Sequence, residues 1–424
     1  MFPDIRPRRS LLPRSGIRTA AVIGAVVVAS VGAGVGLPVP AHADPPMPQV
    51  DPFYQPPEDF AAAEPGTILR SRPVQLPFLP VPAQSWQLLY RTTDLFDQPD
   101  VTVTTVILPE GARPDRPLVS HQLYEDSSGP QCVPSYELQQ ADAPVTVAGM
   151  QMPYYVPELR QGWVVSVPDV EGRFGHFGVA KEPGYMVLDG IRAAQRFGPL
   201  GLNPHTKVGL AGYSAGGLST GWTAQMAPSY APEINLAGAT MGGPVPDLAA
   251  VMVSVDDQPT SGQVGMILAS LAAAYPEFGA VLGRHLTPAG SAVVDEIRSE
   301  CASTWALTQL GPHWSRYLDM PLDQFLTLPT IKETLDSTTL GAPAPTAPLY
   351  VYQGVADQWN PVAATDRMVD NYCAAGTPVT YTRSAASKHL HEGLGGNPAA
   401  LAWLQERLDT DTPAPSRCST SNVP

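Results

Sequence analysis

The residues best suited to chemistry lie in 212–216, which reads Gly-Tyr-Ser-Ala-Gly. A serine between two glycines at this spacing is typical of a nucleophile elbow, a sharp turn from a strand into a helix. The turn is too tight for bulky neighbours, so small residues leave the serine hydroxyl exposed. An apolar run at 208–211 precedes the turn, and a helical stretch follows it to Met226. This context predicts Ser214 as a nucleophile.

A serine hydroxyl needs a histidine as base and a carboxylate that orients the histidine. In this type of site the acid precedes the histidine along the chain. His389 and His391 lie in a predicted loop before the closing helix, and their positions alone do not decide between them. Asp357 directly follows a predicted strand and is favoured as the acid over Asp366 and Asp370, which lie in a predicted helix.

Attack of such a serine on a carbonyl group also needs donors for the negative charge that develops on the substrate oxygen. The backbone N–H of Ala215, next to the nucleophile, is one expected donor. The second is expected in the loop after the strand predicted at 118–124, which begins Tyr-Glu-Asp-Ser-Ser at Tyr124. Asp169 and Glu171 could form a reactive carboxylate pair, but solvation or a structural hydrogen bond is the favoured interpretation.

The elements that must position these residues alternate between strand and helix. Strands are predicted at 85–91, 101–108, 118–124, 162–167, 208–211, 236–240, 349–352 and 379–382, and helices at 184–197 and 398–408. Short apolar strands between helices predict an α/β fold with a mainly parallel sheet and helices on both faces.

One block interrupts this alternation. Between about 245 and 340 the patterns are helical, as at 265–282 and 291–310, which predicts a helical cap inserted into the α/β domain of residues 84–424. An acyl tunnel and ordinary cap packing explain one set of cap side chains equally well: Met252, Met266 and 267–271. Three aromatic residues of the cap are more typical of a core than of a platform for substrate: Trp305, Trp314 and Tyr317.

The N-terminus has the pattern of a secretory signal peptide. Five arginines precede an apolar run at 19–37, and Ala41-His42-Ala43 is a suitable cleavage site. We expect residues 1–43 to be removed and the protein to be secreted or to stay at the cell envelope; an uncleaved membrane anchor is the alternative. The Pro-rich segment 44–83 is predicted to be an arm on the surface.

Charge and cysteines limit the partners. Loss of residues 1–43 removes five arginines and one aspartate and changes the formal net charge from −14 to −18. Such an acidic chain disfavours nucleic acid and anionic membranes as partners.

The four cysteines are scattered along the chain, and in an exported protein they predict two disulfides, whose pairing stays open. Their spacing does not fit a metal site. No metal, cofactor or obligate protein partner is expected.

Seven segments together resemble the secretory lipases of the Candida antarctica lipase A type, α/β-hydrolases with many actinobacterial members. The segments are 124–126, 132–136, 167–172, 187–194, 212–216, 352–357 and 398–404, within a resemblance that covers about 66–408. The resemblance implies Ser214, Asp357 and His389 as catalytic triad, and Asp126 with Ala215 as oxyanion hole. The second histidine, His391, departs from the family pattern.

The resemblance also implies disulfides Cys132–Cys301 and Cys373–Cys418 and a cap that acts as an acyl-binding lid. The expected function is a triacylglycerol lipase or carboxylesterase that acts on a lipid or other ester, with transient contact to a lipid interface. An acyltransferase or peptidase on the same fold is the alternative enzyme. A non-catalytic envelope protein that retains the fold is the alternative from another class.

Overall fold

The computed structural model describes residues 44–424 except 310, 312 and 411. The predicted signal peptide, with its cleavage point after Ala43, lies outside the described residues. In the described part, ten strands form one sheet in the order β1-β2-β3-β5-β4-β6-β7-β8-β9-β10. The strands are β1 (Ile68–Val74), β2 (Ala83–Thr93), β3 (Pro99–Pro109), β4 (Leu118–Gln122), β5 (Val164–Pro168), β6 (Val208–Tyr213), β7 (Leu236–Gly242), β8 (Leu349–Gly354), β9 (Val379–Ser384) and β10 (Ser419–Val423).

The sheet is antiparallel at one edge and parallel elsewhere. β1, β2, β3 and β5 pair antiparallel, and every pairing from β5 to β10 is parallel. Each residue of β4, β5, β6 and β8 is buried, as expected for short strands covered on both faces. The predicted α/β fold with a mainly parallel sheet is confirmed.

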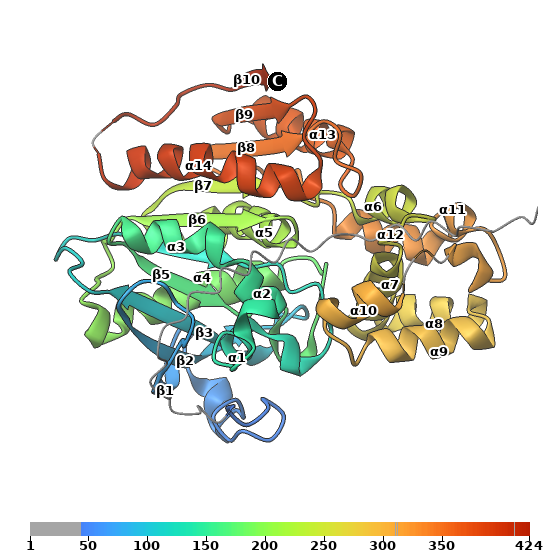
Figure 1. Cartoon of the computed structure of the whole chain (residues 1–424), viewed down its shortest axis with the longest axis horizontal. Coiled ribbons are helices and arrows are strands. Elements are labelled where there is room, and N and C mark those ends of the chain that lie inside the picture. The colour runs from blue at the N-terminus through green and yellow to red at the C-terminus, as the bar shows by residue number, and fades with distance from the viewer. Residues whose placement is uncertain (1–43, 310, 312, 411) are drawn as a thin grey trace, which may run out of the picture. The chain divides into compact units, whose positions relative to one another are not determined.

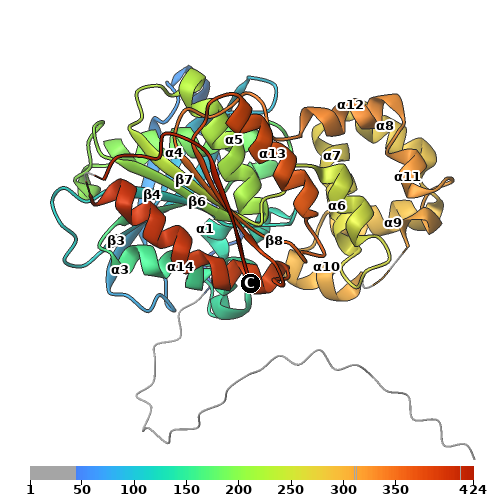
Figure 2. The ribbon, with the colours of Figure 1, turned by 90° about the horizontal axis from the view of Figure 1, so that it is seen from above.

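Helices cover both faces of this sheet (Figures 1 and 2). One face carries α3 (Met152–Arg160) and α14 (His389–Leu408), and the other carries α4 (Glu182–Arg196), α5 (Ala215–Tyr230) and α13 (Val362–Ala374). Two short helices, α1 (Pro134–Glu137) and α2 (Val147–Met150), lie between β4 and β5 in the chain. Single 3₁₀ turns are η1 (Phe60–Ala62), η2 (Pro130–Cys132), η3 (Ala143–Val145), η4 (Gly172–Phe174), η5 (Gly198–Leu200) and η6 (Trp314–Arg316). No helix among the described residues has the length and hydropathy needed to cross a bilayer.

Seven helices separate β7 from β8 in the chain and gather beside one end of the sheet (Figure 1). They are α6 (Leu248–Val255), α7 (Gly262–Ala274), α8 (Pro276–His285), α9 (Pro288–Ile297), α10 (Ala302–Thr308), α11 (Leu322–Phe325) and α12 (Pro329–Ser337). Met252, Met266, Trp305 and Trp314 are buried in the hydrophobic core that these helices share with the sheet. Their burial favours packing over an acyl tunnel. The boundaries of leader, arm and cap stay predictions.

Two strands, β1 and β10, were not predicted from the sequence. The segment expected to be only a surface arm contains β1, and its residue Asp51 accepts a hydrogen bond from Arg72 at 2.7 Å. The chain was also expected to close on a helix, whereas β10 follows α14 and pairs with β9. Both strands are at sheet edges, and β10 is fully exposed, so neither carries the apolar pattern from which strands are predicted.

Two disulfides connect parts of the chain that lie far apart in sequence. Cys132 bonds to Cys301 and Cys373 to Cys418, with sequence separations of 169 and 45. These pairs are those that the family resemblance implied. The first joins η2, in the loop after β4, to the start of α10.

Candidate active site

Ser214 occupies the turn between β6 and α5. Its backbone has φ 57° and ψ −123°, a left-handed conformation that a non-glycine residue adopts only where its surroundings impose it. A Cβ on Gly216 would lie 2.0 Å from the carbonyl oxygen of Gln122, and a Cβ on Gly212 would lie 2.2 Å from that of Gly216. Gly216 is therefore required for this turn to pack against β4, and Gly212 is required for the turn itself to close.

His389 lies against Ser214 and is the first residue of α14, not part of a loop as expected from the sequence. Its Nε2 atom is 3.0 Å from Ser214 Oγ, and its Nδ1 atom is 2.7 Å from Asp357 Oδ2. The ring is 2% exposed, with the rings of Tyr213 and Trp359 centred 5.1 and 4.6 Å from its own centre. His391 is exposed. The structure thus brings His389, and not His391, to Ser214.

Asp357 is held by the loop that follows β8. Its Oδ1 atom accepts the backbone N–H groups of Trp359 and Asn360, both at 2.9 Å, and Oδ2 accepts the Gln353 side-chain amide at 2.9 Å. These donors orient the carboxylate toward the His389 Nδ1 atom. Asp366 instead binds Tyr381 and Arg383, and Asp370 is exposed, so the other two candidate acids do not reach the histidine.

The two expected oxyanion donors, Ala215 and Asp126, differ in whether the backbone N–H group is free to donate to a substrate. Ala215 is the first residue of α5, where backbone N–H groups have no carbonyl partner within the helix. The N–H of Asp126, by contrast, donates to Glu171 Oε1 at 3.0 Å. Only the carboxyl group of Asp126 is left, and it can donate only when protonated. Burial raises its pKa from 3.8 to about 6, against the opposing effect of His389.

Asp169 and Glu171 lie behind this loop and are both buried. Asp169 accepts hydrogen bonds from the Ser135 N–H at 2.8 Å and the Ser135 hydroxyl at 2.6 Å. Burial raises the pKa of Asp169 to about 7 and that of Glu171 well above its ordinary value. Their hydrogen bonds agree with a structural interpretation. The contact of Glu171 with Asp126 was not predicted, because it joins two loops that lie 45 residues apart in the chain.

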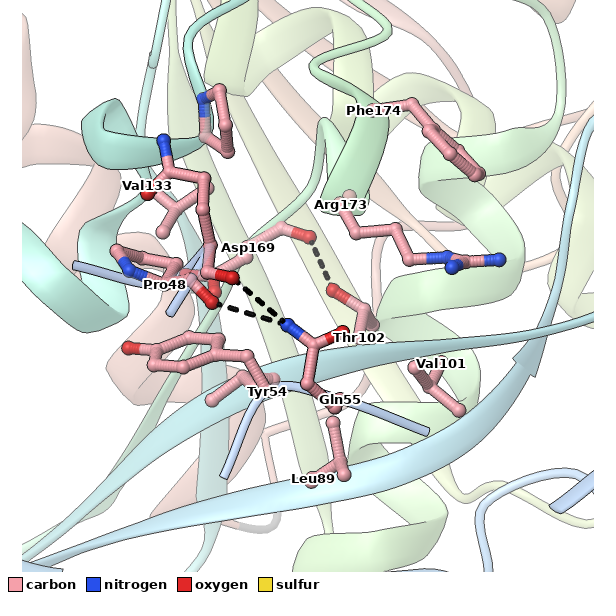
Figure 3. A pocket seen from close by; sticks show the side chains of 14 residues that line it. Pro48, Tyr54, Gln55, Leu89, Val101, Thr102, Val133, Asp169, Arg173 and Phe174 are labelled. Carbon is pink, nitrogen blue, oxygen red and sulfur yellow. Dashed lines mark hydrogen bonds between the residues drawn. The ribbon is translucent and has the colours of Figure 1, made fainter. Parts of the chain in front are cut away.

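Asp169 also lines a pocket of about 180 Å³ between the N-terminal segment and the sheet. Figure 3 shows Tyr54 and Gln55 on one wall of this pocket, and the Thr102 hydroxyl donating to the Asp169 carbonyl oxygen at 3.0 Å. None of the three triad candidates lines it. A separate cavity of about 10 Å³ lies beside Ala215, with Leu123 and Leu218 on its walls.

One group of metal-ligating side chains occurs among the described residues. Asp256, Asp257 and His313 bring their ligand atoms within 4.8 Å of one another on the cap. The histidine already pairs with both carboxylates, at 3.0 and 2.9 Å, and two of the three side chains are exposed. That the reaction needs no metal or cofactor stays a prediction.

A family model for secretory lipases matches residues 139–415. The chain belongs to the secretory lipase family. Relatives of this chain include a probable inactive lipase of Mycobacterium tuberculosis, 38% identical, with 85% of this chain and 82% of the relative covered. Lipase A of Arthroderma benhamiae is 32% identical over 91% of this chain and 85% of its own length. A secreted triacylglycerol lipase of Malassezia globosa is 33% identical over 85% and 81%.

The fold of this chain is similar to that of Candida antarctica lipase A in its closed state. The TM-score is 0.82 at 26% identity, with 89% of this chain and 91% of the other covered. The family resemblance stated from sequence motifs is therefore confirmed, and so is the α/β-hydrolase fold. Since the relatives include one named as inactive, membership alone does not establish catalysis by this chain.

Proposed function

We propose that this chain is a secreted serine hydrolase that cleaves lipid esters, as a triacylglycerol lipase or carboxylesterase, through an acyl-enzyme on Ser214. The observation that carries the proposal is the hydrogen-bonded series from Ser214 Oγ through His389 to Asp357. A non-catalytic role is the second candidate, favoured by the name of the Mycobacterium tuberculosis relative. The presence of all three side chains, Ser214, His389 and Asp357, each within hydrogen-bonding distance of the next, argues against a non-catalytic role.

In the proposed mechanism, Ser214 Oγ attacks the ester carbonyl carbon while His389 Nε2 accepts the hydroxyl proton. Asp357 stabilises the imidazolium that forms. When the tetrahedral intermediate collapses, His389 returns the proton to the departing alcohol, and the acyl group stays on the serine. A water molecule then attacks the acyl-enzyme by the same steps, releasing the fatty acid.

The proposed oxyanion hole uses one backbone donor and one side-chain donor. The N–H of Ala215 donates at the start of α5, and the protonated carboxyl of Asp126 donates from the opposite side. A raised pKa supports this role, because Asp126 can then keep its proton in mildly acidic solution. Removal of one donor of this kind typically lowers kcat about 100- to 1,000-fold.

The proposed lipid substrate is supported by exposed apolar side chains next to the histidine. Leu390 and Leu394 lie one turn apart in the first part of α14, and they are 60% and 59% exposed. Such residues can enter a lipid surface transiently. Leu390→Ser with Leu394→Ser should lower hydrolysis of emulsified triacylglycerol while hydrolysis of a soluble ester persists; equal rates on the emulsion would reject the contact.

Labelling with a fluorophosphonate probe tests the proposed function. We expect the wild-type protein to be labelled covalently and the Ser214→Ala variant to remain unlabelled. No labelling of the wild type, or labelling that survives in Ser214→Ala, would reject the serine hydrolase. Hydrolysis of p-nitrophenyl esters from acetate to palmitate then separates lipase from esterase, since a rate confined to acetate and butyrate would reject the lipase.

Secretion is proposed from the N-terminal signal and from the family to which the chain belongs. The mature protein should begin at Asp44 if cleavage follows Ala43. Mass spectrometry of the protein from culture medium and from the cell envelope measures this directly. A full-length N-terminus in the membrane fraction would favour the uncleaved anchor.

A further inference from the structure

Both backbone polar groups of Asp126 are engaged, each by a side chain from a different part of the fold. Its N–H donates to Glu171 Oε1 at 3.0 Å, and its carbonyl oxygen accepts the Trp305 indole N–H at 2.9 Å. The φ of Asp126 is 50°, in the left-handed region. A non-glycine residue stays in this region only where its surroundings hold it there, and these two contacts do so.

Glu171 is itself fixed by a reciprocal contact. Glu125 Oε1 accepts the N–H of Val170 at 2.7 Å and that of Glu171 at 3.4 Å, while Glu171 accepts the N–H of Asp126. The two glutamates lie in the loops after the adjacent parallel strands β4 and β5, and each accepts amides from the other loop. Both are buried, so the contacts are sheltered from competing water.

Trp305 reaches the same loop from the cap. It lies on α10 and is 3% exposed. The start of α10 is attached to the loop at two further points, the Ala302 N–H that donates to Ser127 Oγ at 2.8 Å and the Cys132–Cys301 disulfide. The indole is therefore held against Asp126 by a helix that cannot move away independently of the loop.

We propose that Glu171 and Trp305 are positioning residues for the oxyanion hole: by occupying both backbone polar groups of Asp126, they direct its carboxyl group, and not its amide, toward the substrate oxygen. This inference rests on the proposed function. An oxyanion donor must lie about 2.7–3.1 Å from the developing charge, and a displacement of about 1 Å can lower the rate about 100-fold. Glu171 and Trp305 touch neither substrate nor triad in this scheme and act through Asp126.

The test removes each contact by a single substitution, and the volume that Trp305→Phe also removes is matched in a control. Trp305→Phe deletes the indole N–H, and Glu171→Met deletes the acceptor, whereas Glu171→Gln keeps an acceptor oxygen. We expect Trp305→Phe and Glu171→Met to lower kcat for a soluble ester about 10- to 100-fold with KM little changed, because an oxyanion contact acts in the transition state. Glu171→Gln should restore most of the kcat lost in Glu171→Met.

Two matched controls separate positioning from general damage to the fold. Trp314→Phe removes another buried indole N–H of the cap, which donates to the Ser261 carbonyl oxygen at 2.7 Å. Glu137→Met removes another buried carboxylate, which accepts the Ala148 N–H at 2.7 Å. Both should lower the melting temperature as much as the test variants and leave kcat close to that of the wild type.

A double-mutant cycle with Asp126→Ala completes the test. Once the carboxyl group is absent nothing is left to position, so adding Trp305→Phe should no longer change kcat. The inference is overturned if Trp305→Phe lowers kcat no more than Trp314→Phe, or if its effect persists in the Asp126→Ala background. Trp305→Phe decides the outcome even if Glu171→Met fails to fold. Absence of fluorophosphonate labelling in the wild type would instead reject the proposed function itself.

Discussion

At the scale of single residues, the candidate site combines a strained serine with a histidine confined between aromatic rings. The left-handed backbone of Ser214 lifts its hydroxyl out of the turn, and the rings of Tyr213 and Trp359 limit how far His389 can rotate. The Asp357 carboxylate is fixed by two backbone donors. Little reorganisation is therefore needed before attack, which is how preorganised sites lower a barrier.

The two histidines at the start of α14 should differ sharply when each is replaced by alanine. His389→Ala removes the group that contacts Ser214 at 3.0 Å, so kcat should fall at least about 10,000-fold. His391 is exposed, and His391→Ala should keep most of the wild-type kcat. Steady-state kinetics on a soluble ester measures both variants. If kcat falls more in His391→Ala than in His389→Ala, then His391 is the base and His389 is not.

The pH profile should reveal whether Asp126 donates through its carboxyl group. With a pKa raised to about 6, this group is protonated below that pH and loses its proton above it, and a carboxylate cannot donate to an oxyanion. Loss of this proton should therefore add a decline with rising pH, centred near pH 6, to the kcat/KM profile of the wild type. Asp126→Asn offers a neutral amide donor at every pH, so this decline should disappear.

A surface carboxylate provides the control for the pH experiment. Asp366→Asn alters an acid that pairs with Arg383 and should leave the wild-type profile unchanged. If Asp126→Asn keeps the same alkaline decline as the wild type, another group is responsible and the carboxyl donor is wrong.

At the scale of elements, the clearest consequence comes from the connection between the cap and the loop after β4, which carries Asp126. Helix α10 is linked to the loop after β4 by a disulfide, an N–H to hydroxyl hydrogen bond and the Trp305 indole. Any movement of the cap that includes α10 must also displace Asp126.

The two disulfides should therefore have different effects when removed. Cys132→Ser with Cys301→Ser opens a link across 169 residues and should lower the free energy of unfolding by about 2–5 kcal/mol and also lower kcat. The Cys373–Cys418 disulfide joins α13 to the segment before β10. Its removal by Cys373→Ser with Cys418→Ser should lower the free energy of unfolding without lowering kcat. Urea denaturation and ester kinetics measure the two quantities. Equal losses of kcat would contradict the link between cap and site.

At the scale of the whole molecule, buried carboxyl groups dominate the electrostatics of an already acidic chain. Burial raises the pKa of Glu137 and Asp169 to about 7 and that of Asp189 to about 6. The folded protein thus holds protons that the unfolded chain releases near its ordinary values of 4.5 and 3.8. Between about pH 4 and 7 the folded state binds more protons than the unfolded state, so rising pH favours unfolding.

The free energy of unfolding should consequently fall as the pH rises from about 4 to 7. The net negative charge acts in the same direction, because repulsion grows as further carboxyl groups ionise. Urea denaturation across this interval measures the slope, and Glu137→Gln should make it shallower by removing one of the linked protons. A free energy that rises with pH would contradict this account.

Features that depend on short-range sterics and on the hydrophobic period could be predicted from the amino-acid sequence alone. The elbow at 212–216 could be recognised because a tight turn excludes all but small residues beside Ser214. The parallel sheet could be predicted because strands buried on both faces are continuous apolar runs, as at 164–168 and 208–213. The edge strand β10 lacked such a pattern because none of its residues is buried.

Which of the candidate groups contact one another depends on the three-dimensional packing of the chain. Two histidines two residues apart are equivalent in sequence, but on the first turn of α14 one ring faces Ser214 and the other faces solvent. The use of the Asp126 N–H by Glu171, and of its carbonyl by Trp305, depends on contacts across 45 and 179 residues. Such contacts are set by the packing of β4, β5 and α10 against one another, which no local pattern encodes.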